Sequence, residues 1–218
     1  MLTLGLPGFG WDTSKVSGFT EPGHEVNARL FLPLARQGAQ QYVPWRVASE
    51  QVGLSFGALT TWDELVRAAD GDPAWEIPRG TVDDATARAL TGALARPSTD
   101  GAAVSAWFAL WEGYAGEIDT SLHDATTPIP ATGQNFLCDG SYRLLTAPLG
   151  WALTRTDQQR LHFPVAVWPA DRSFVLASAI YQDSFYLSCS RETFTVVRAA
   201  GLELLEIDPD MPLPSRGD

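Results

Sequence analysis

Cysteine, histidine and lysine are rare in this sequence. Its 218 residues include two cysteines, three histidines and a single lysine, Lys15. A disulfide-stabilised secreted domain needs more cysteines, and neither Cys138 nor Cys189 belongs to a Cys-x-x-Cys pair of the kind that binds zinc. The three histidines lie too far apart in sequence for a short metal-binding motif. The sequence therefore predicts two buried free thiols, no metal site and no cofactor.

Long apolar runs and basic charge are also scarce. No apolar stretch approaches the roughly 20 residues of a membrane-spanning helix, and the first ten residues lack the basic start of a signal peptide. Acidic residues number 26 against 15 basic ones, which gives a net charge of −11. Nucleic acids and anionic membranes are bound through basic patches, so we expect neither as a partner. We expect a cytoplasmic protein whose charge suits a basic protein partner or a small ligand, and its oligomeric state stays open.

The residues that are abundant indicate a folded domain. Apolar residues make up 45% of the chain and aromatic residues 11%, enough for a substantial core. Alternation of polar and apolar residues predicts strands, and apolar residues at helical spacing after a capping residue predict helices. Residues 104–111 are apolar on both faces, as in a central strand. The predicted strands are 26–32, 104–111, 142–146, 165–168, 174–180, 185–187 and 203–207, and the predicted helices are 45–52, 62–69, 83–95, 149–158 and 191–200.

The order of these elements predicts the fold class. Links of hairpin length between residues 165 and 188 favour antiparallel pairing. We therefore predict an α+β fold with one mostly antiparallel sheet and helices packed mainly on one face. Glycine and proline mark residues 1–23 as an irregular N-terminal arm, residues 24–208 form a single domain, and residues 209–218 form a flexible tail. The mostly polar residues 115–140 predict a long loop, which is typical of a lid, a binding loop or a disordered segment.

Three segments resemble a group of actinobacterial proteins that has no established activity. They are NARLFLP at 27–33, WFALWEGYA at 107–115, and VWPADRSFVLASAIYQDSFYLSCSRETF at 167–194. The corresponding patterns of the group are YARIxHP, WxxLWEGYG, and a Trp-Trp-Pro-x-Asp-Arg turn between two strands. Leu32 replaces the histidine of the first pattern, Val167 replaces the first tryptophan of the last, and Ala179 and Tyr181 replace two carboxylates that follow it. The resemblance therefore implies a shared fold and not a shared carboxylate chemistry.

Three charged side chains are candidates for a site, each with a structural alternative. Glu112 follows Trp111 at a strand end, where a neighbouring indole could raise the carboxyl pKa and make it a general acid. An exposed carboxylate paired with an arginine explains the same pattern, and we favour that interpretation. Asp171 and Arg172 occupy a turn, where Asp171 is expected to accept bonds from nearby backbone N–H groups and Arg172 could receive an anion.

Cys189 and the aromatic residues complete the candidates. Cys189 precedes a predicted helix, whose N-terminus could lower the thiol pKa and activate a nucleophile. Its neighbours are serines and not the glycines of a nucleophile elbow, so we favour a core thiol. Trp168 and Trp111 could stack on a ligand or anchor a partner, although core packing is the usual role at strand spacing.

No complete catalytic constellation emerges, so our interpretation is a non-enzymatic protein-binding domain with an acidic surface, comparable at most to immunity or antitoxin proteins. Its candidate binding residues are Trp111, Glu112, Trp168, Asp171 and Arg172. The alternative is a small-molecule-binding protein or hydrolase-like enzyme, with a site where Glu112, the 115–140 loop and the 169–172 turn meet. A buried carboxylate in a concave site would favour this alternative. A second alternative is a structural subunit of an assembly.

Overall fold

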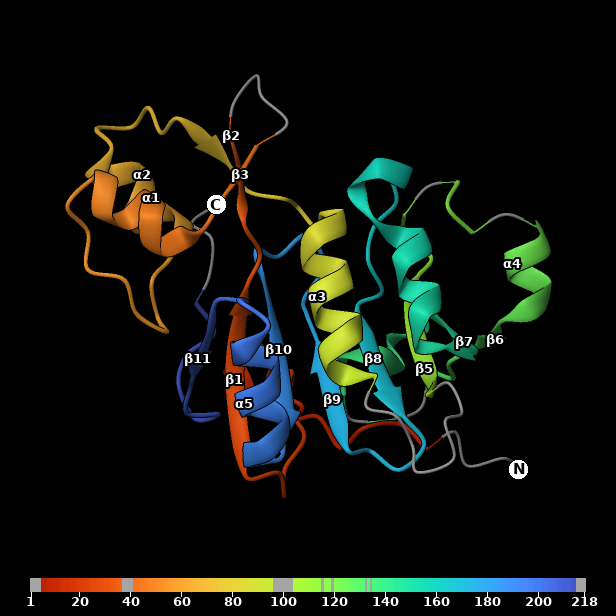
Figure 1. Ribbon diagram of the computed structural model, residues 1–218. Helices are drawn as coiled ribbons and strands as arrows, with labels where there is room; N and C mark the ends of the chain where they lie inside the picture. Colours follow the sequence, from red (N-terminus) through yellow and green to blue (C-terminus); the bar gives the residue numbers. More distant parts are fainter. Residues whose placement is uncertain are drawn as a thin grey trace.

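A computed structural model describes residues 5–36, 41–95, 104–114, 116–118, 120–131, 133 and 135–214. The described chain forms an eight-stranded sheet in the order β11-β1-β10-β9-β8-β5-β7-β6, and all of its paired strands are antiparallel (Figure 1). Its strands are β1 (Val26–Phe31), β5 (Ser105–Trp111), β6 (Thr127–Pro128), β7 (Tyr142–Pro148), β8 (Ala166–Pro169), β9 (Phe174–Ala177), β10 (Ser184–Cys189) and β11 (Leu204–Glu206). The apolar strand expected at 104–111 is indeed internal, because β5 pairs with β7 on one side and β8 on the other.

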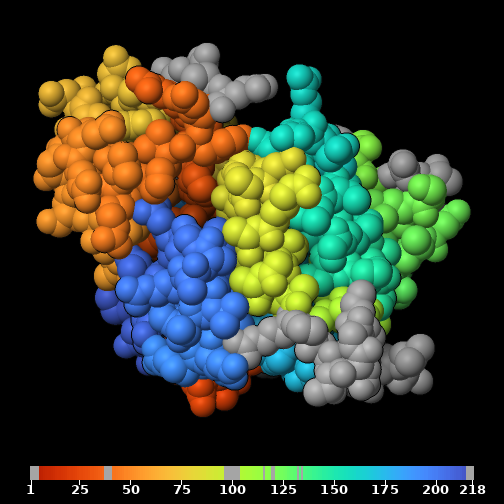
Figure 2. Space-filling view, viewed as in Figure 1, coloured from red at the N-terminus to blue at the C-terminus, as the bar shows by residue number. Residues whose placement is uncertain are grey.

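Helices cover one face of this sheet. They are α3 (Asp84–Leu94), α5 (Arg191–Ala199) and the 3₁₀ segment η3 (Leu149–Arg155), which pack on alternate strand residues such as Leu30, Phe108 and Leu187. Figure 2 shows α5 and α3 side by side across this face. Helices α3 and α5 begin within one residue of the predicted starts at 83 and 191, because Asp83 and Ser190 accept bonds from backbone N–H groups in the first turn of each helix. The predicted α+β class, with an antiparallel sheet and helices mainly on one face, is confirmed.

The other face is covered by the two ends of the chain. Phe9, Val16 and Phe19 of the N-terminal arm are buried there against Trp168 and neighbouring strand residues. Within the described residues 5–23 of the arm, the regular structure is one short 3₁₀ turn, η1 (Val16–Gly18).

The described part of the C-terminal segment, residues 209–214, differs from the flexible tail that we predicted for 209–218, whose last four residues lie outside the described part of the chain. The N–H of Val16 donates to the Met211 carbonyl at 3.0 Å, and the N–H of Leu213 donates to the Ser14 carbonyl at 2.7 Å. Both apolar side chains, Met211 and Leu213, pack against the core of this face. The two ends of the chain satisfy each other's backbone groups, which neither segment's composition indicates.

A small lobe adjoins the main sheet and was not expected. The lobe consists of residues 34–36 and 41–77, with β2 (Leu34–Arg36), β3 (Tyr42–Val43), β4 (Trp75–Glu76), α1 (Trp45–Gln51) and α2 (Trp62–Ala68). Its three strands form a separate antiparallel sheet in the order β3-β2-β4. The lobe has its own apolar core around Trp45, and a capping box of Thr61 and Glu64 starts α2, close to the predicted helix at 62–69.

Arg29 joins the lobe to the main sheet. Its guanidinium is fully buried and pairs with Asp183 at 3.0 Å. It also donates to the lobe carbonyls of Ala58 at 3.1 Å and Thr60 at 2.7 Å, and to the Ser184 hydroxyl at 2.8 Å. These acceptors take the place of the water molecules that would otherwise hydrate the guanidinium, so the cation can be buried.

The segment expected to be a loop over 115–140 contains short regular elements. They are α4 (Thr120–Ala125), β6 and the 3₁₀ segment η2 (Phe136–Asp139). The helix predicted at 149–158 is instead two 3₁₀ segments, η3 and η4 (Asp157–Gln159). No helix in the described parts of the chain is long and apolar enough to cross a membrane.

Candidate functional site

The residues expected to meet in one site lie at opposite ends of β5. Pro169, which opens the 169–172 turn, pairs with Ala106 near the start of β5, whereas Glu112 follows its last residue, Trp111. An antiparallel strand rises about 3.4 Å per residue, so about 20 Å separate the turn from Glu112. The alternative site that we placed between Glu112 and this turn is therefore not formed.

The 169–172 turn has a structural role. Asp171 accepts a bond from the Ser173 N–H at 3.0 Å, as expected of aspartate in a turn. Arg172 donates to the Glu21 carboxylate and to the Leu6 carbonyl, each at 2.6 Å. Arg172 therefore holds the N-terminal arm in place. The anion that it binds is the Glu21 carboxylate of this chain and not a ligand.

Glu112 and Trp168 also contribute to packing. The Glu112 side chain is 44% exposed and pairs with Arg143 at 3.2 Å, which is the arrangement that we favoured. Arg143 in turn donates to the Thr126 hydroxyl and to the His123 carbonyl, and so holds the α4–β6 segment against β7. Trp168 is buried under the N-terminal arm, so its ring does not offer a surface to a ligand.

The two thiols lie on opposite faces of the sheet and do not meet. Cys189 is fully buried in the core beneath the helices, whereas Cys138 packs against the core beneath the chain ends. Burial raises the pKa of the Cys189 thiol to about 11. The thiol is therefore protonated at neutral pH and is not activated by the helix that follows it.

A different carboxylate, Glu117, occupies the end of the sheet where β5 stops and β8 begins. One of its oxygens is bonded to Nδ1 of His162. The other accepts from the Arg155 guanidinium at 2.6 Å and from the His162 backbone N–H at 3.0 Å. The Arg155 and Glu117 side chains are only 6% and 11% exposed, and together with His162 they form one hydrogen-bonded network.

Aromatic rings fix the orientation of His162. The Tyr114 ring stacks on the imidazole with centroids 3.8 Å apart and planes inclined by 4°, and Tyr181 contacts both rings edge-on. Burial raises the pKa of the Tyr114 phenol, which stays neutral. Tyr181 has a φ of 61°, a conformation that is unusual away from glycine. Such backbone strain is often found at functional sites.

Gly80 permits the close approach of these rings to the segment before α3. A Cβ atom at Gly80 would lie 3.3 Å from both the His162 ring and the Tyr114 hydroxyl, and its φ is +85°. The Gly80 carbonyl accepts from the Phe163 N–H at 2.9 Å, and the Val82 carbonyl accepts from the Asp157 N–H at 2.9 Å. Residues 80–82 and 157–163 therefore run beside each other and place His162 at the mouth of the site.

His162 faces a hollow of about 640 Å³ between the main sheet and the lobe. Its Nδ1 is held by Glu117, whereas its Nε2 makes no hydrogen bond to any described residue. The hollow is lined by Ala35, Trp62, Pro73, Trp75, Glu76, Ile77, Pro78, Arg79, Thr81 and His162. A carboxylate that holds one imidazole nitrogen leaves the other free to bind or exchange a proton with a ligand.

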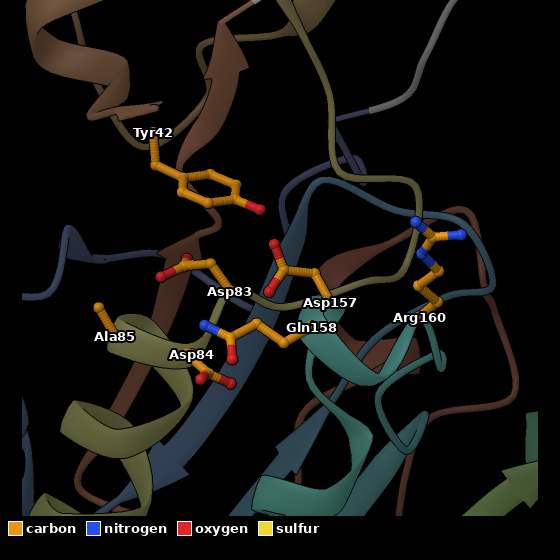
Figure 3. A pocket seen from close by; sticks show the side chains of 7 residues that line it. All are labelled: Tyr42, Asp83, Asp84, Ala85, Asp157, Gln158 and Arg160. Carbon is orange, nitrogen blue, oxygen red and sulfur yellow. The ribbon is translucent and has the colours of Figure 1, made fainter. Parts of the chain in front are cut away.

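A second hollow of about 460 Å³ lies beside residues 83–85 at the start of α3 and residues 157–160 of the neighbouring segment. Figure 3 shows three carboxylates around it, from Asp83, Asp84 and Asp157, with Tyr42 reaching toward them from β3. The Asp83 carboxylate already caps α3 by accepting from the Thr86 N–H at 2.9 Å. No group of histidine, cysteine and carboxylate side chains suited to a metal ion occurs in the described residues.

Sequence reasoning came near this site without finding it. The WEGYA segment supplies both Trp111 and Tyr114, and the predicted 115–140 loop supplies Glu117. The partner of Glu117 is His162, 45 residues further on. No local spacing links two side chains so far apart, so only the strand order brings them together.

No protein-family model, curated protein or solved structure matches this chain. The likeness to the actinobacterial group thus stays a prediction from three sequence segments, and the function has to be argued from the geometry of the site.

Proposed function

We propose that this protein binds a small molecule in the hollow between the main sheet and the lobe. The observation that supports this most is the His162–Glu117 pair, because the imidazole is bonded at Nδ1 to a largely buried carboxylate and His162 lines the hollow. Its volume of about 640 Å³ lies within the range of small-ligand sites, which is about 300–1,000 Å³. This is the alternative that we tied to a buried carboxylate in a concave site, with Glu117 in place of Glu112.

His162 is the group that we expect to touch the ligand through its polar end. Arg155 donates to Glu117, Glu117 orients the imidazole, and the Tyr114 ring restricts the rotation of the imidazole. A histidine held in this way accepts a hydrogen bond or a proton at Nε2 without first reorganising. The same arrangement would serve either binding alone or acid–base chemistry.

The test is a fragment screen in which binding is detected through the NMR signals of the His162 ring. A fragment that binds in the hollow should shift the His162 ring signals in an NMR spectrum of histidine-labelled protein. At ten times its Kd it should also stabilise the fold by about 1.4 kcal/mol. For a chain of this length that corresponds to a rise in Tm of about 3–6 °C.

Two variants make this screen decisive. His162→Asn should abolish the thermal shift, whereas His123→Asn, which alters an exposed histidine on α4, should leave it unchanged. The proposal fails if no fragment moves the His162 signals, or if the hits stabilise His162→Asn as well as the unmodified protein.

Binding of a basic protein partner, our first interpretation of the sequence, is a second proposal. It rests on the net charge of −11 and on lobe carboxylates of Asp70 and Asp72, which form no ion pair with described residues. Such a surface favours association with a cationic protein at low salt. Asp70→Lys with Asp72→Lys should then weaken a salt-sensitive complex isolated from cells, and an unchanged complex would exclude this surface.

A further inference from the structure

Two opposite charges border the hollow without partners. Glu76 at the end of β4 and Arg79 three residues later are both exposed and both line the hollow. Neither forms an ion pair or a side-chain hydrogen bond with a described residue. The buried arginines of this fold behave differently, since Arg29, Arg143 and Arg155 each face a carboxylate.

The backbone that carries Arg79 has a defined shape. Arg79 and Gly80 both have positive φ values, of 31° and 85°. The turn is closed by the Thr81 N–H, which donates to the Pro78 carbonyl at 2.7 Å, and by the Phe163 N–H, which donates to Gly80 at 2.9 Å. On the other side, Glu76 is fixed by pairing of β4 with Ala35 of β2. The two charges are thus carried by separate, hydrogen-bonded pieces of backbone.

The wall of the hollow is partly polar and partly apolar. Its apolar residues include Trp62, Trp75, Pro73, Ile77 and Pro78. Trp75 belongs to the core of the lobe and Trp62 packs against that core, so these rings form a fixed surface. Apolar residues of this kind can contact an aliphatic or aromatic side chain of a ligand.

These features together restrict the ligand. An anion would satisfy Arg79 but would meet Glu76 and a protein of net charge −11. A cation would satisfy Glu76 and leave Arg79 unpaired. A zwitterion matches both groups and carries no net charge into the field of the protein. Arg79 can hold a carboxylate by two parallel hydrogen bonds, and Glu76 can accept from an ammonium group.

We propose, building on the small-molecule function above, that the hollow binds a free α-amino acid with an apolar side chain. Arg79 receives the carboxylate and Glu76 the ammonium group. Trp62 and its apolar neighbours contact the side chain, and Nε2 of His162 makes a hydrogen bond to the polar end of the ligand.

The experiment is calorimetry at low salt with leucine, methionine, phenylalanine and tryptophan as probes. The amino acid that binds most tightly is then compared with three analogues, each of which lacks one of its groups. For phenylalanine they are 3-phenylpropionate, which lacks the ammonium group, 2-phenylethylamine, which lacks the carboxylate, and glycine, which lacks the side chain. The amino acid should bind at least about tenfold more tightly than each analogue, a difference of about 1.4 kcal/mol.

Two substitutions should separate the charges. Glu76→Gln should weaken the amino acid about tenfold and leave 3-phenylpropionate unaffected, whereas Arg79→Gln should weaken the amino acid and leave 2-phenylethylamine unaffected. Glu50→Gln and Arg67→Gln are the matched controls, because both side chains are exposed on the lobe and neither lines the hollow. Neither control should change any affinity.

The results distinguish this inference from the proposed function. If an analogue with one charge binds as tightly as the amino acid, or if none of the four amino acids binds below about 10 mM, the amino-acid inference is wrong. Fragments that still shift the His162 signals would then leave small-molecule binding intact. If neither amino acids nor fragments bind, both proposals fail.

Discussion

The Glu117 carboxylate should contribute strongly to stability, and Glu117→Gln tests this with little change in size. The substitution removes the charge that faces the buried Arg155 guanidinium at 2.6 Å and the acceptor of His162 Nδ1. Burial lowers the pKa of Arg155, and Glu117 is the neighbour that opposes this effect most. Removing one partner of a buried ion pair costs about 3–5 kcal/mol. This is a large share of a total stability of about 5–15 kcal/mol.

Glu112→Gln is the matched control. It makes the same chemical change only five positions away, but the Glu112 side chain is 44% exposed. Its partner Arg143 keeps three other acceptors, which are the Thr126 hydroxyl and the carbonyls of Thr126 and His123. An exposed ion pair contributes at most about 1 kcal/mol, so Glu112→Gln should change stability little.

Urea unfolding of the two variants provides the assay, followed by both fluorescence and circular dichroism to check that the transition is two-state. Glu117→Gln should lower the free energy of unfolding by about 3 kcal/mol or more. It should also weaken any ligand found for the hollow, because His162 loses its fixed orientation. Equal losses in the two variants would refute the network as we describe it.

Three further outcomes follow from buried or strained groups. Gly80→Ala should cost about 1–3 kcal/mol, because Gly80 has a positive φ and a Cβ there would contact His162 and Tyr114. Gly92→Ala in α3, where a Cβ meets nothing within 4 Å, should instead stabilise the fold by about 0.5–1 kcal/mol. The Tm values of the two variants, compared with that of the unmodified protein, check both predictions. Asp183→Ala should cost about 3–5 kcal/mol since Arg29 stays buried without its carboxylate, and Arg29→Met in the same chain should recover part of this loss in urea unfolding. Stability should be unaffected by Cys189 below pH 9 and fall by up to about 1.4 kcal/mol per pH unit between about 9 and 11, because the unfolded thiol loses its proton before the native one. Cys189→Ala should flatten that part of the pH profile, and an unchanged slope would contradict the burial of the thiol.

Local chemistry explains why the helix starts were predictable. The Thr61–Glu64 capping box and the caps at Asp83 and Ser190 each involve residues within three positions of one another. Such contacts form from the chain's own neighbours, so the sequence pattern contains all the partners. Likewise, two apolar faces placed β5 inside the sheet, since burial on both sides leaves no position for a polar residue.

Long-range pairing explains where the sequence prediction failed. Arg29 lies within an apolar strand pattern, and nothing near it in sequence indicates that Asp183 and the lobe carbonyls enclose it. The C-terminal segment looked like a flexible tail because its partners, Ser14 and Val16, stand at the other end of the chain. The lobe sheet depends on pairing of β2 with β3 and β4, each too short to give a clear alternation of its own.

The sequence by itself determined the fold class, the acidic charge, the helix starts and the central strand, because these depend on composition and on contacts between near neighbours. The tertiary structure alone decided the site. The order of β5, β8 and β9 separated Glu112 from the 169–172 turn and brought Glu117 to His162. Side chains that act together need only be close in space. Strand order determines which side chains lie close together, and no local sequence pattern encodes it.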